Sequence, residues 1–164
     1  MPQARAAALH ALQLDDTLPE AHVALALVVQ NYDWDWTTSE KEYRRAIELN
    51  PNYATAHHWY AEHLAWRGRF PEALHESEIA RSLDPLSMII DTDNAMIFHY
   101  SRQYDRAIEQ FHVVQELDPN FSHAHMVAHA YIQNGQYADA LAELERWLKD
   151  SGDGPALWSV SALL

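Results

Sequence analysis

The sequence predicts an all-α fold in which antiparallel helix pairs stack side by side. The 164 residues include only 4 Gly and 7 Pro, and 48 % of them are hydrophobic. This composition favours helices separated by sharp stops. Pro51, Pro85 and Pro119 recur at one constant interval, within the similar phrases AIELNPN, ARSLDPL and VQELDPN. A constant interval of this size, about 34 residues, indicates a stacked repeat architecture.

The chain begins with a predicted helix over residues 4–14 (ARAAALHALQL), the second helix of a truncated unit that spans 4–17. The first complete unit is 20–53, where the phrase YDWDW at 32–36 replaces a glycine-containing turn. We expect Trp34 and Trp36 to fill the gap between successive units, because large aromatic side chains commonly do so. The alternative is an aromatic patch on the edge of the loop.

The second helix of that first unit is expected to begin near Glu40. Thr37, Thr38 or Ser39 can cap it, since hydroxyl side chains accept hydrogen bonds from the free N–H groups of a first turn. Glu40 and Arg44 have the i,i+4 spacing of neighbours on a helix and are expected to lie on a solvated outer face.

The unit 54–87 shows the pattern most clearly. Its first helix is predicted from Ala54 to Arg67, and its second from about Pro71 to Leu83. Proline is tolerated in the first turn of a helix because its missing N–H has no partner to lose there. Pro85 then stops the second helix.

Two further units are predicted at 88–120 and 121–154. Residues 155–164 (PALWSVSALL) resemble the first helix of a later, truncated unit and are strongly apolar. Such a helix lacks the polar outer face of a capping repeat, so we expect the chain to be a segment of a longer array with weak end-to-end self-association through 155–164.

The repeated residues resemble the tetratricopeptide repeat. The unit 54–87 has Ala61, Leu64, Gly68, Phe70, Ala73, Ala80 and Pro85 at the family's positions. The next unit has Ala95, Phe98, Tyr104, Ala107, Phe111 and Pro119, with Arg102 at the turn glycine. The last has Ala128, Tyr131, Gly135, Tyr137 and Ala140, with Trp147 in place of an alanine. The resemblance implies an α-solenoid with a right-handed superhelix that serves protein–protein interaction, similar to arrays in bacterial multidomain regulatory proteins.

The resemblance also implies that the first helix of each unit lines a concave groove. By register with the family, the candidate binding residues are Asn31, Tyr32, His58, Glu62, Trp66, Thr92, Met96, His99, Tyr100, His125, His129 and Gln133. None of them is Lys or Arg, so a clamp for a terminal carboxylate is not expected. A neutral or mildly basic peptide with apolar anchors fits better. The alternative for Trp66 and Tyr100 is packing against neighbouring helices.

Catalysis, cofactors and nucleic acid are not expected. The chain has no Cys, no glycine-rich phosphate loop and no HExxH motif. A net charge of −13 opposes binding to nucleic acid or to anionic lipid. No signal or membrane-spanning stretch is present in the sequence, which favours a cytoplasmic location. His125 and His129 are spaced as a weak candidate metal pair, but a site needs more ligands.

We therefore expect a module that binds a peptide or helix in a concave groove. Two alternatives stay open. One is a structural spacer with no ligand of its own. The other is a non-catalytic sensor array attached to a DNA-binding, cyclase or kinase domain.

Overall fold

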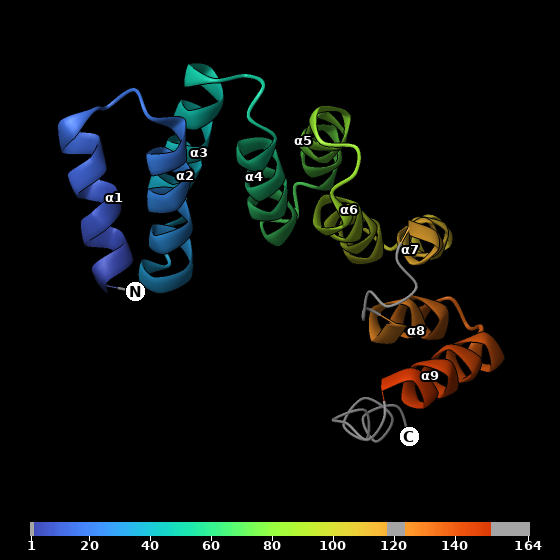
Figure 1. The fold of residues 1–164 in the computed structure, drawn as a ribbon. Helices are drawn as coiled ribbons and strands as arrows, with labels where there is room; N and C mark the ends of the chain where they lie inside the picture. Colours follow the sequence, from blue (N-terminus) through green and yellow to red (C-terminus); the bar gives the residue numbers. More distant parts are fainter. Residues whose placement is uncertain (1, 118–123, 152–164) are drawn as a thin grey trace. The chain divides into compact units, whose positions relative to one another are not determined.

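The computed structural model describes residues 2–117 and 124–151, with side chains for 3–117 and 126–146. Its elements are α1 (Pro2–Leu14), α2 (Pro19–Val28), the π-helix η1 (Val29–Asp33), α3 (Trp36–Leu49), α4 (Ala54–Trp66), α5 (Phe70–Leu83), α6 (Met88–Tyr100), α7 (Tyr104–Leu117), α8 (Ala124–Gln133) and α9 (Tyr137–Ser151) (Figure 1). Every described element is a helix, which confirms the all-α class. The segment 155–164 lies outside the described residues.

The chain divides into two compact parts, 1–90 and 91–164. In the N-terminal part, consecutive helices run in opposite directions, and α2 packs against α1, α3 and α4 (Figure 1). Ala8, Leu25 and Val29 form one buried cluster, with Leu12 packed against it. The fully buried alanines of this part are Ala26, Ala46, Ala56, Ala73 and Ala80. Small side chains at such places let neighbouring backbones pack tightly.

The structure confirms the helices predicted for the unit 54–87. α4 ends at Trp66, and α5 begins at Phe70 with proline in its first turn. The backbone N–H of Asp84, just before Pro85, donates to the Ala80 carbonyl as α5 ends.

The start of α3 was predicted incorrectly. The helix begins at Trp36 rather than near Glu40, because Asp35 is its N-cap. Asp35 Oδ1 accepts from the backbone N–H of Thr38 at 3.0 Å, and Oδ2 accepts from the Thr38 hydroxyl at 2.6 Å. A carboxylate is a favoured cap because it satisfies a free N–H and faces the positive end of the helix dipole. Thr37, Thr38 and Ser39 therefore lie inside the helix.

The turn between the two helices of each pair has one residue with a left-handed backbone. These residues are Trp34 (φ 56°), Gly68 (φ 72°), Arg102 (φ 62°) and Gly135 (φ 76°). Glycine adopts this conformation without a steric penalty, whereas a side chain crowds the following carbonyl. Trp34 and Arg102 thus occupy positions that favour glycine.

The first helix of the first pair contains one extra residue. The stretch from Pro19, where α2 starts, to the turn residue Trp34 is longer by this one residue than the stretch from Ala54, where α4 starts, to Gly68. The extra residue is accommodated by the π-helix Val29–Asp33, which widens one turn. Both helices consequently enter their turns in equivalent positions.

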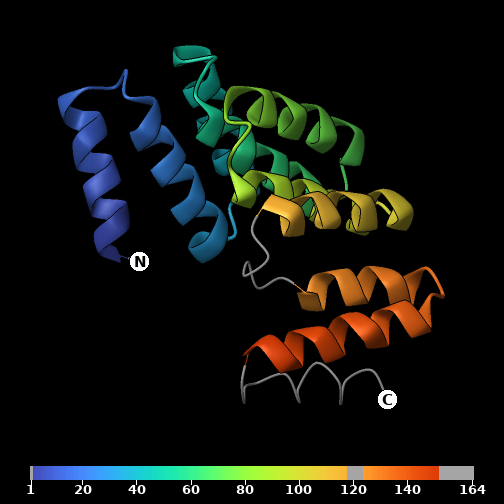
Figure 2. The same cartoon turned by 45° about the vertical axis from the view of Figure 1, so that its right-hand side comes forward.

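In the C-terminal part, α8 and α9 lie side by side (Figure 2). Ala128, Ala140 and Leu144 form the buried cluster between them, with Tyr131 and Ile132 packed alongside. None of the described helices is both long enough and apolar enough to cross a membrane.

Candidate protein-binding surface

The predicted groove residues differ widely in exposure. Exposed members are Asn31, Tyr32, Trp66, Tyr100, His129 and Gln133, and half-buried members are Glu62, Met96 and His99. His58 and Thr92 are buried, with exposed fractions of 7 % and 3 %, which differs from the exposed groove positions expected for them. The side chain of His125 lies outside the described residues. The groove as a whole stays a prediction.

Three exposed aromatic residues occupy the same repeat position. Tyr32, Trp66 and Tyr100 recur at the same interval as the prolines, and each lies just ahead of a left-handed turn residue, at the second position before it. Their exposed fractions are 57 %, 46 % and 47 %. We call these three residues the recurring aromatics. Rings with about half of their surface in water are only partly used in packing, which weakens the alternative that Trp66 and Tyr100 serve the core.

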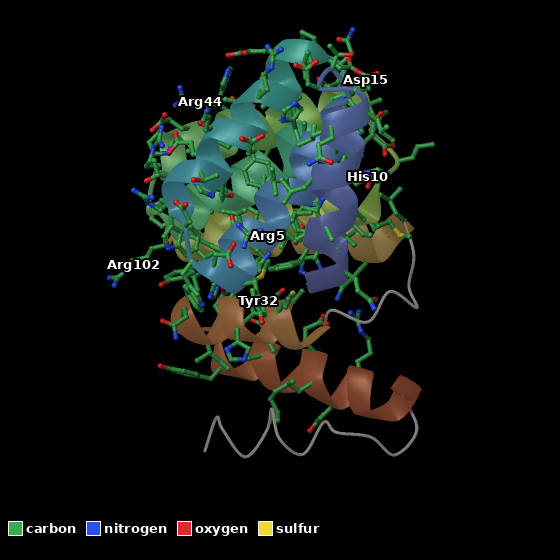
Figure 3. The ribbon with its side chains drawn as sticks, turned by 90° about the vertical axis from the view of Figure 1, so that its left-hand side faces the viewer. Arg5, His10, Asp15, Tyr32, Arg44 and Arg102 are labelled. Carbon is green, nitrogen blue, oxygen red and sulfur yellow. The ribbon has the colours of Figure 1, made fainter. Side chains whose placement is uncertain are left out.

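Trp34, Trp36 and Trp66 form a row of rings at the end of α2 and α4. The centroids of Trp34 and Trp36 are 6.1 Å apart with an interplanar angle of 69°, and those of Trp36 and Trp66 are 6.2 Å apart at 81°. Both contacts are edge-to-face, an arrangement that aromatic quadrupoles favour. Figure 3 shows Tyr32 at the same end of α2, away from the loop that carries Asp15.

The exposure of Trp34 corrects the sequence prediction. It was expected to fill a gap between units, but 71 % of its surface is in water. Trp36 is half-buried and contacts rings on both sides. The alternative weighed for these residues, an aromatic patch on the loop edge, describes Trp34 better.

A buried polar cluster lies beneath the row. His63 is fully buried 5.7 Å from Trp36 (ring centroids), and its Nδ1 is 2.6 Å from the Gln30 amide oxygen. Burial lowers the pKa of His63 to about 4, and the charges of Arg67 and Arg69 act in the same direction against the opposing effect of Glu40. The ring is therefore neutral at pH 7, with Nδ1–H donating to Gln30. Sequence reasoning missed this cluster because the π-helix that places Gln30 has no clear sequence signal.

Glu40 of α3 lies in a charged network, whereas Lys41, Arg44, Arg45 and Glu48 are exposed, as expected for a solvated face. Glu40 Oε1 accepts from Arg44 at 2.9 Å, from Arg69 at 2.7 Å and from the Tyr60 hydroxyl at 3.1 Å. Its side chain is only 21 % exposed. Burial raises the pKa of Glu40, but the hydrogen bond and charge of Arg69 outweigh that effect, so the net shift is downward. These side chains satisfy one another's hydrogen bonds and link α3, α4 and the turn before α5.

Comparisons with known proteins agree with this architecture. Residues 99–164 match the family model described as tetratricopeptide repeat. Among solved structures, PilF of Pseudomonas aeruginosa has a TM-score of 0.78 at 23 % identity, covering 93 % of this chain and 70 % of PilF. Residues 99–164 therefore match the tetratricopeptide-repeat family, and the similarity to solved structures shows that most of the chain shares their fold.

Other tetratricopeptide structures are similar over most of the chain. A thermophilic tetratricopeptide protein of Thermus thermophilus has a TM-score of 0.78 at 18 % identity, covering 95 % of this chain and 87 % of its own. MamA of Desulfovibrio magneticus has a TM-score of 0.75 at 15 % identity, and the match covers 87 % of this chain and 82 % of the MamA chain. At these identities the likeness shows the shared fold. No curated protein sequence matches significantly.

Two of the helix pairs contain the same set of histidine contacts, which we call the histidine clip. His22 Nδ1 is 2.6 Å from Glu42 Oε2, and its Nε2 is 3.0 Å from the Asp16 carbonyl. His57 makes the same pair of contacts, at 2.6 Å to Glu76 Oε2 and 3.0 Å to the Pro51 carbonyl. Each clip joins the first helix both to the second helix of its unit and to the preceding loop.

The charge state of His57 follows from its partners. A carboxylate and a carbonyl both accept hydrogen bonds, so the ring satisfies both only when both nitrogens carry protons. Burial opposes the charged ring, but the hydrogen bonds to Glu76 and the Pro51 carbonyl, with the charge of Glu76, outweigh it and raise the pKa of His57.

Tetratricopeptide proteins are in general non-catalytic modules for protein–protein interaction. Within the described residues, no three His, Asp or Glu side chains are grouped closely enough to hold a metal ion. The pair His125 and His129 is untested, because the first side chain is not among those described.

Proposed function

We propose that this chain is a peptide-binding module whose first helices bind extended or helical segments of other proteins, each helix through its own recurring aromatic. The observation that carries the proposal is the presence of an exposed aromatic at one repeat position, in Tyr32, Trp66 and Tyr100. A repeat array offers one copy of each position per unit, so a recurring exposed residue presents the same kind of contact in successive units.

The chemistry of these residues suits protein recognition. Tyrosine and tryptophan bury a large area at the cost of few rotatable bonds and keep a polar tip for hydrogen bonds to a peptide backbone. None of the candidate groove residues is Lys or Arg. The preferred segment is therefore neutral or mildly basic, with apolar anchors.

Its setting in a larger bacterial regulatory protein is a further part of the proposal. It rests on the similarity of the phrase from DWDW to HLA (33–65) to arrays in such proteins, and the sequence of the parent chain would test it. If the chain is instead a spacer without a ligand of its own, no peptide should be selected in the binding experiment below.

The test is selection of binding peptides from a random display library, followed by calorimetric titration of the selected peptides. Trp66→Ala and Tyr100→Ala should each weaken binding about 5- to 30-fold, the range expected for an interface aromatic that contributes about 1–2 kcal/mol. Tyr137→Ala is the matched control, because Tyr137 is 69 % exposed but belongs to a second helix, α9. Failure to select any peptide, or equal losses in the control, would favour the spacer.

A further inference from the structure

We propose that Trp34 and the neighbouring Asp35 form a docking site for an arginine side chain of the partner protein. This Trp34 site deepens the proposed function. It rests on that function because it assumes that the partner is a protein segment. It names a chemical group in the partner and a position in the array where that group binds.

Trp34 is unfavourable for folding in two ways at once. Its φ of 56° is a sterically costly conformation for a residue that carries a side chain. Its ring is 71 % exposed, so little burial offsets this cost. Two of the other three described turns have glycine at this position, Gly68 and Gly135, and the third has Arg102. A strained residue that gains little within the chain points to a contact outside it.

The surroundings hold the Trp34 ring in a defined place. The ring packs edge-to-face on Trp36, which in turn packs on Trp66 and on the buried His63. On the other side, the chain enters the turn from the π-helix Val29–Asp33, a feature often found at functional sites. The indole is thus presented to solvent on a packed base. Tryptophan is the side chain whose ring face attracts cations most strongly.

Charge complementarity identifies a cation as the occupant. Asp33 and Asp35 lie on either side of Trp34 in sequence, in a chain with a net charge of −13. Hydrogen bonds from Thr38 hold the pKa of Asp35 below its ordinary value, so this exposed carboxylate is ionised at pH 7. Asp33 is already paired within the chain, because Arg5 Nη1 of α1 lies 2.7 Å from its Oδ2. The exposed carboxylate of Asp35 is therefore the one that can receive a further cation.

The same chain shows how a guanidinium uses a ring and a carboxylate together. Arg44 Cζ lies 5.9 Å from the centroid of Tyr60, while its Nη2 is 2.9 Å from Glu40. Trp34 and Asp35 present the same two kinds of group to solvent. Arginine fits this pair better than lysine, since its planar head stacks on an aromatic face and still directs N–H groups at a carboxylate.

The test is an NMR titration of the full chain with a capped peptide, Gly-Ser-Arg-Gly-Arg-Ser-Gly, monitored through the tryptophan indole N–H signals. The control peptide has citrulline at both arginine positions, which keeps the shape and removes the charge. The arginine peptide should shift the Trp34 and Trp36 signals and bind about fivefold more tightly than the citrulline peptide, the factor that an exposed cation–π contact of about 1 kcal/mol gives.

Three variants separate the site from the fold. Trp34→Gly removes the ring and places the favoured residue in the turn, so it should fold at least as well and bind the arginine peptide about fivefold more weakly. Asp35→Asn keeps a good N-cap while removing the charge, and should lower both the affinity and its salt dependence. Arg102→Gly makes the same backbone change in the C-terminal part and should leave the affinity unchanged.

Several outcomes would overturn the Trp34 site. These are unchanged binding by Trp34→Gly, equal binding of the citrulline peptide, or no saturable shift up to about 5 mM arginine peptide. If library-selected peptides still depend on Trp66 and Tyr100 in that case, the peptide-binding function stands and only the arginine site fails. If instead the arginine peptide binds through Trp34 while no library peptide is selected, binding through the recurring aromatics fails and the Trp34 site stands.

Discussion

At the scale of single residues, the left-handed turn position shows how the repeats depart from their shared pattern. Two of the four described turns use glycine, and the others use Trp34 and Arg102. The sequence predicted the substitution at Arg102, because the period of the repeat placed it opposite Gly68. It did not predict the role of Trp34, although the same interval places Trp34 opposite Gly68, because the YDWDW phrase has no glycine to mark the turn.

Arg102→Gly should raise the free energy of unfolding by about 1 kcal/mol, because glycine removes the steric cost of φ 62°. Urea unfolding followed by circular dichroism measures the change. Gly68→Ala is the reciprocal control and should lose about the same amount, since an added Cβ would meet nothing within 4 Å and only the backbone conformation is penalised. A destabilised Arg102→Gly protein would show that the arginine side chain makes a contact worth more than the strain.

At the scale of elements, the helix pairs followed the sequence closely where the period is regular. α4 and α5 begin and end within one residue of their predicted bounds, because proline at the start and the turn glycine give unambiguous signals. The start of α3 was missed by one helical turn. Three consecutive hydroxyl residues competed as caps, and only the backbone path after Trp34 makes Asp35 the one that accepts from Thr38.

The π-helix is tied to α4 by one buried hydrogen bond, from His63 Nδ1 to Gln30. Gln30→Leu should lower the free energy of unfolding by about 2 kcal/mol, because it removes the close acceptor of a buried imidazole N–H and leaves only the Ser39 hydroxyl, 3.5 Å from Nδ1. The change introduces the residue type that Leu64 supplies at the equivalent position of the next unit. Thermal and urea unfolding of the variant provide the measurement.

A double variant tests whether the loss belongs to the pair. Gln30→Leu combined with His63→Leu removes both polar groups and should recover most of the stability, since an apolar pair of similar size leaves no unsatisfied donor. If the free energy of unfolding falls in the double variant by the sum of the two single decreases, the packing of the rings around His63 matters more than the hydrogen bond.

At the scale of the whole molecule, the sequence predicted the helical class and the repeat, because both depend on periodic features that survive divergence. The binding surface was harder to predict from the sequence. The family register assigned His58 and Thr92 to the groove, but the structure buries both. Register places a residue on a helix, whereas its exposure depends on the side chains of the neighbouring helices, which differ from unit to unit.

Two buried histidines with opposite pKa shifts should give the chain a stability maximum near the ordinary histidine pKa of 6.5. The pKa of His57 is raised, so its contribution is complete below the unfolded value of about 6.5 and is lost as the pH rises through the folded value. The pKa of His63 is lowered to about 4, so its contribution is complete above 6.5 and is lost as the pH falls toward 4. The melting temperature, measured across this range and on into alkaline solution, should therefore decline on both sides.

Single variants assign each limb of that pH profile. His57→Gln should flatten the alkaline decline while leaving the acid decline, because an amide at this position cannot gain or lose the proton. His63→Leu should reduce the acid decline and leave the alkaline one. Part of the acid decline remains, because burial also lowers the pKa of His99. His10→Gln is the control, since His10 is exposed on α1 and should change neither limb. If His57→Gln left the alkaline decline intact, the clip between α4, Glu76 and the Pro51 carbonyl would not hold a charged ring in solution.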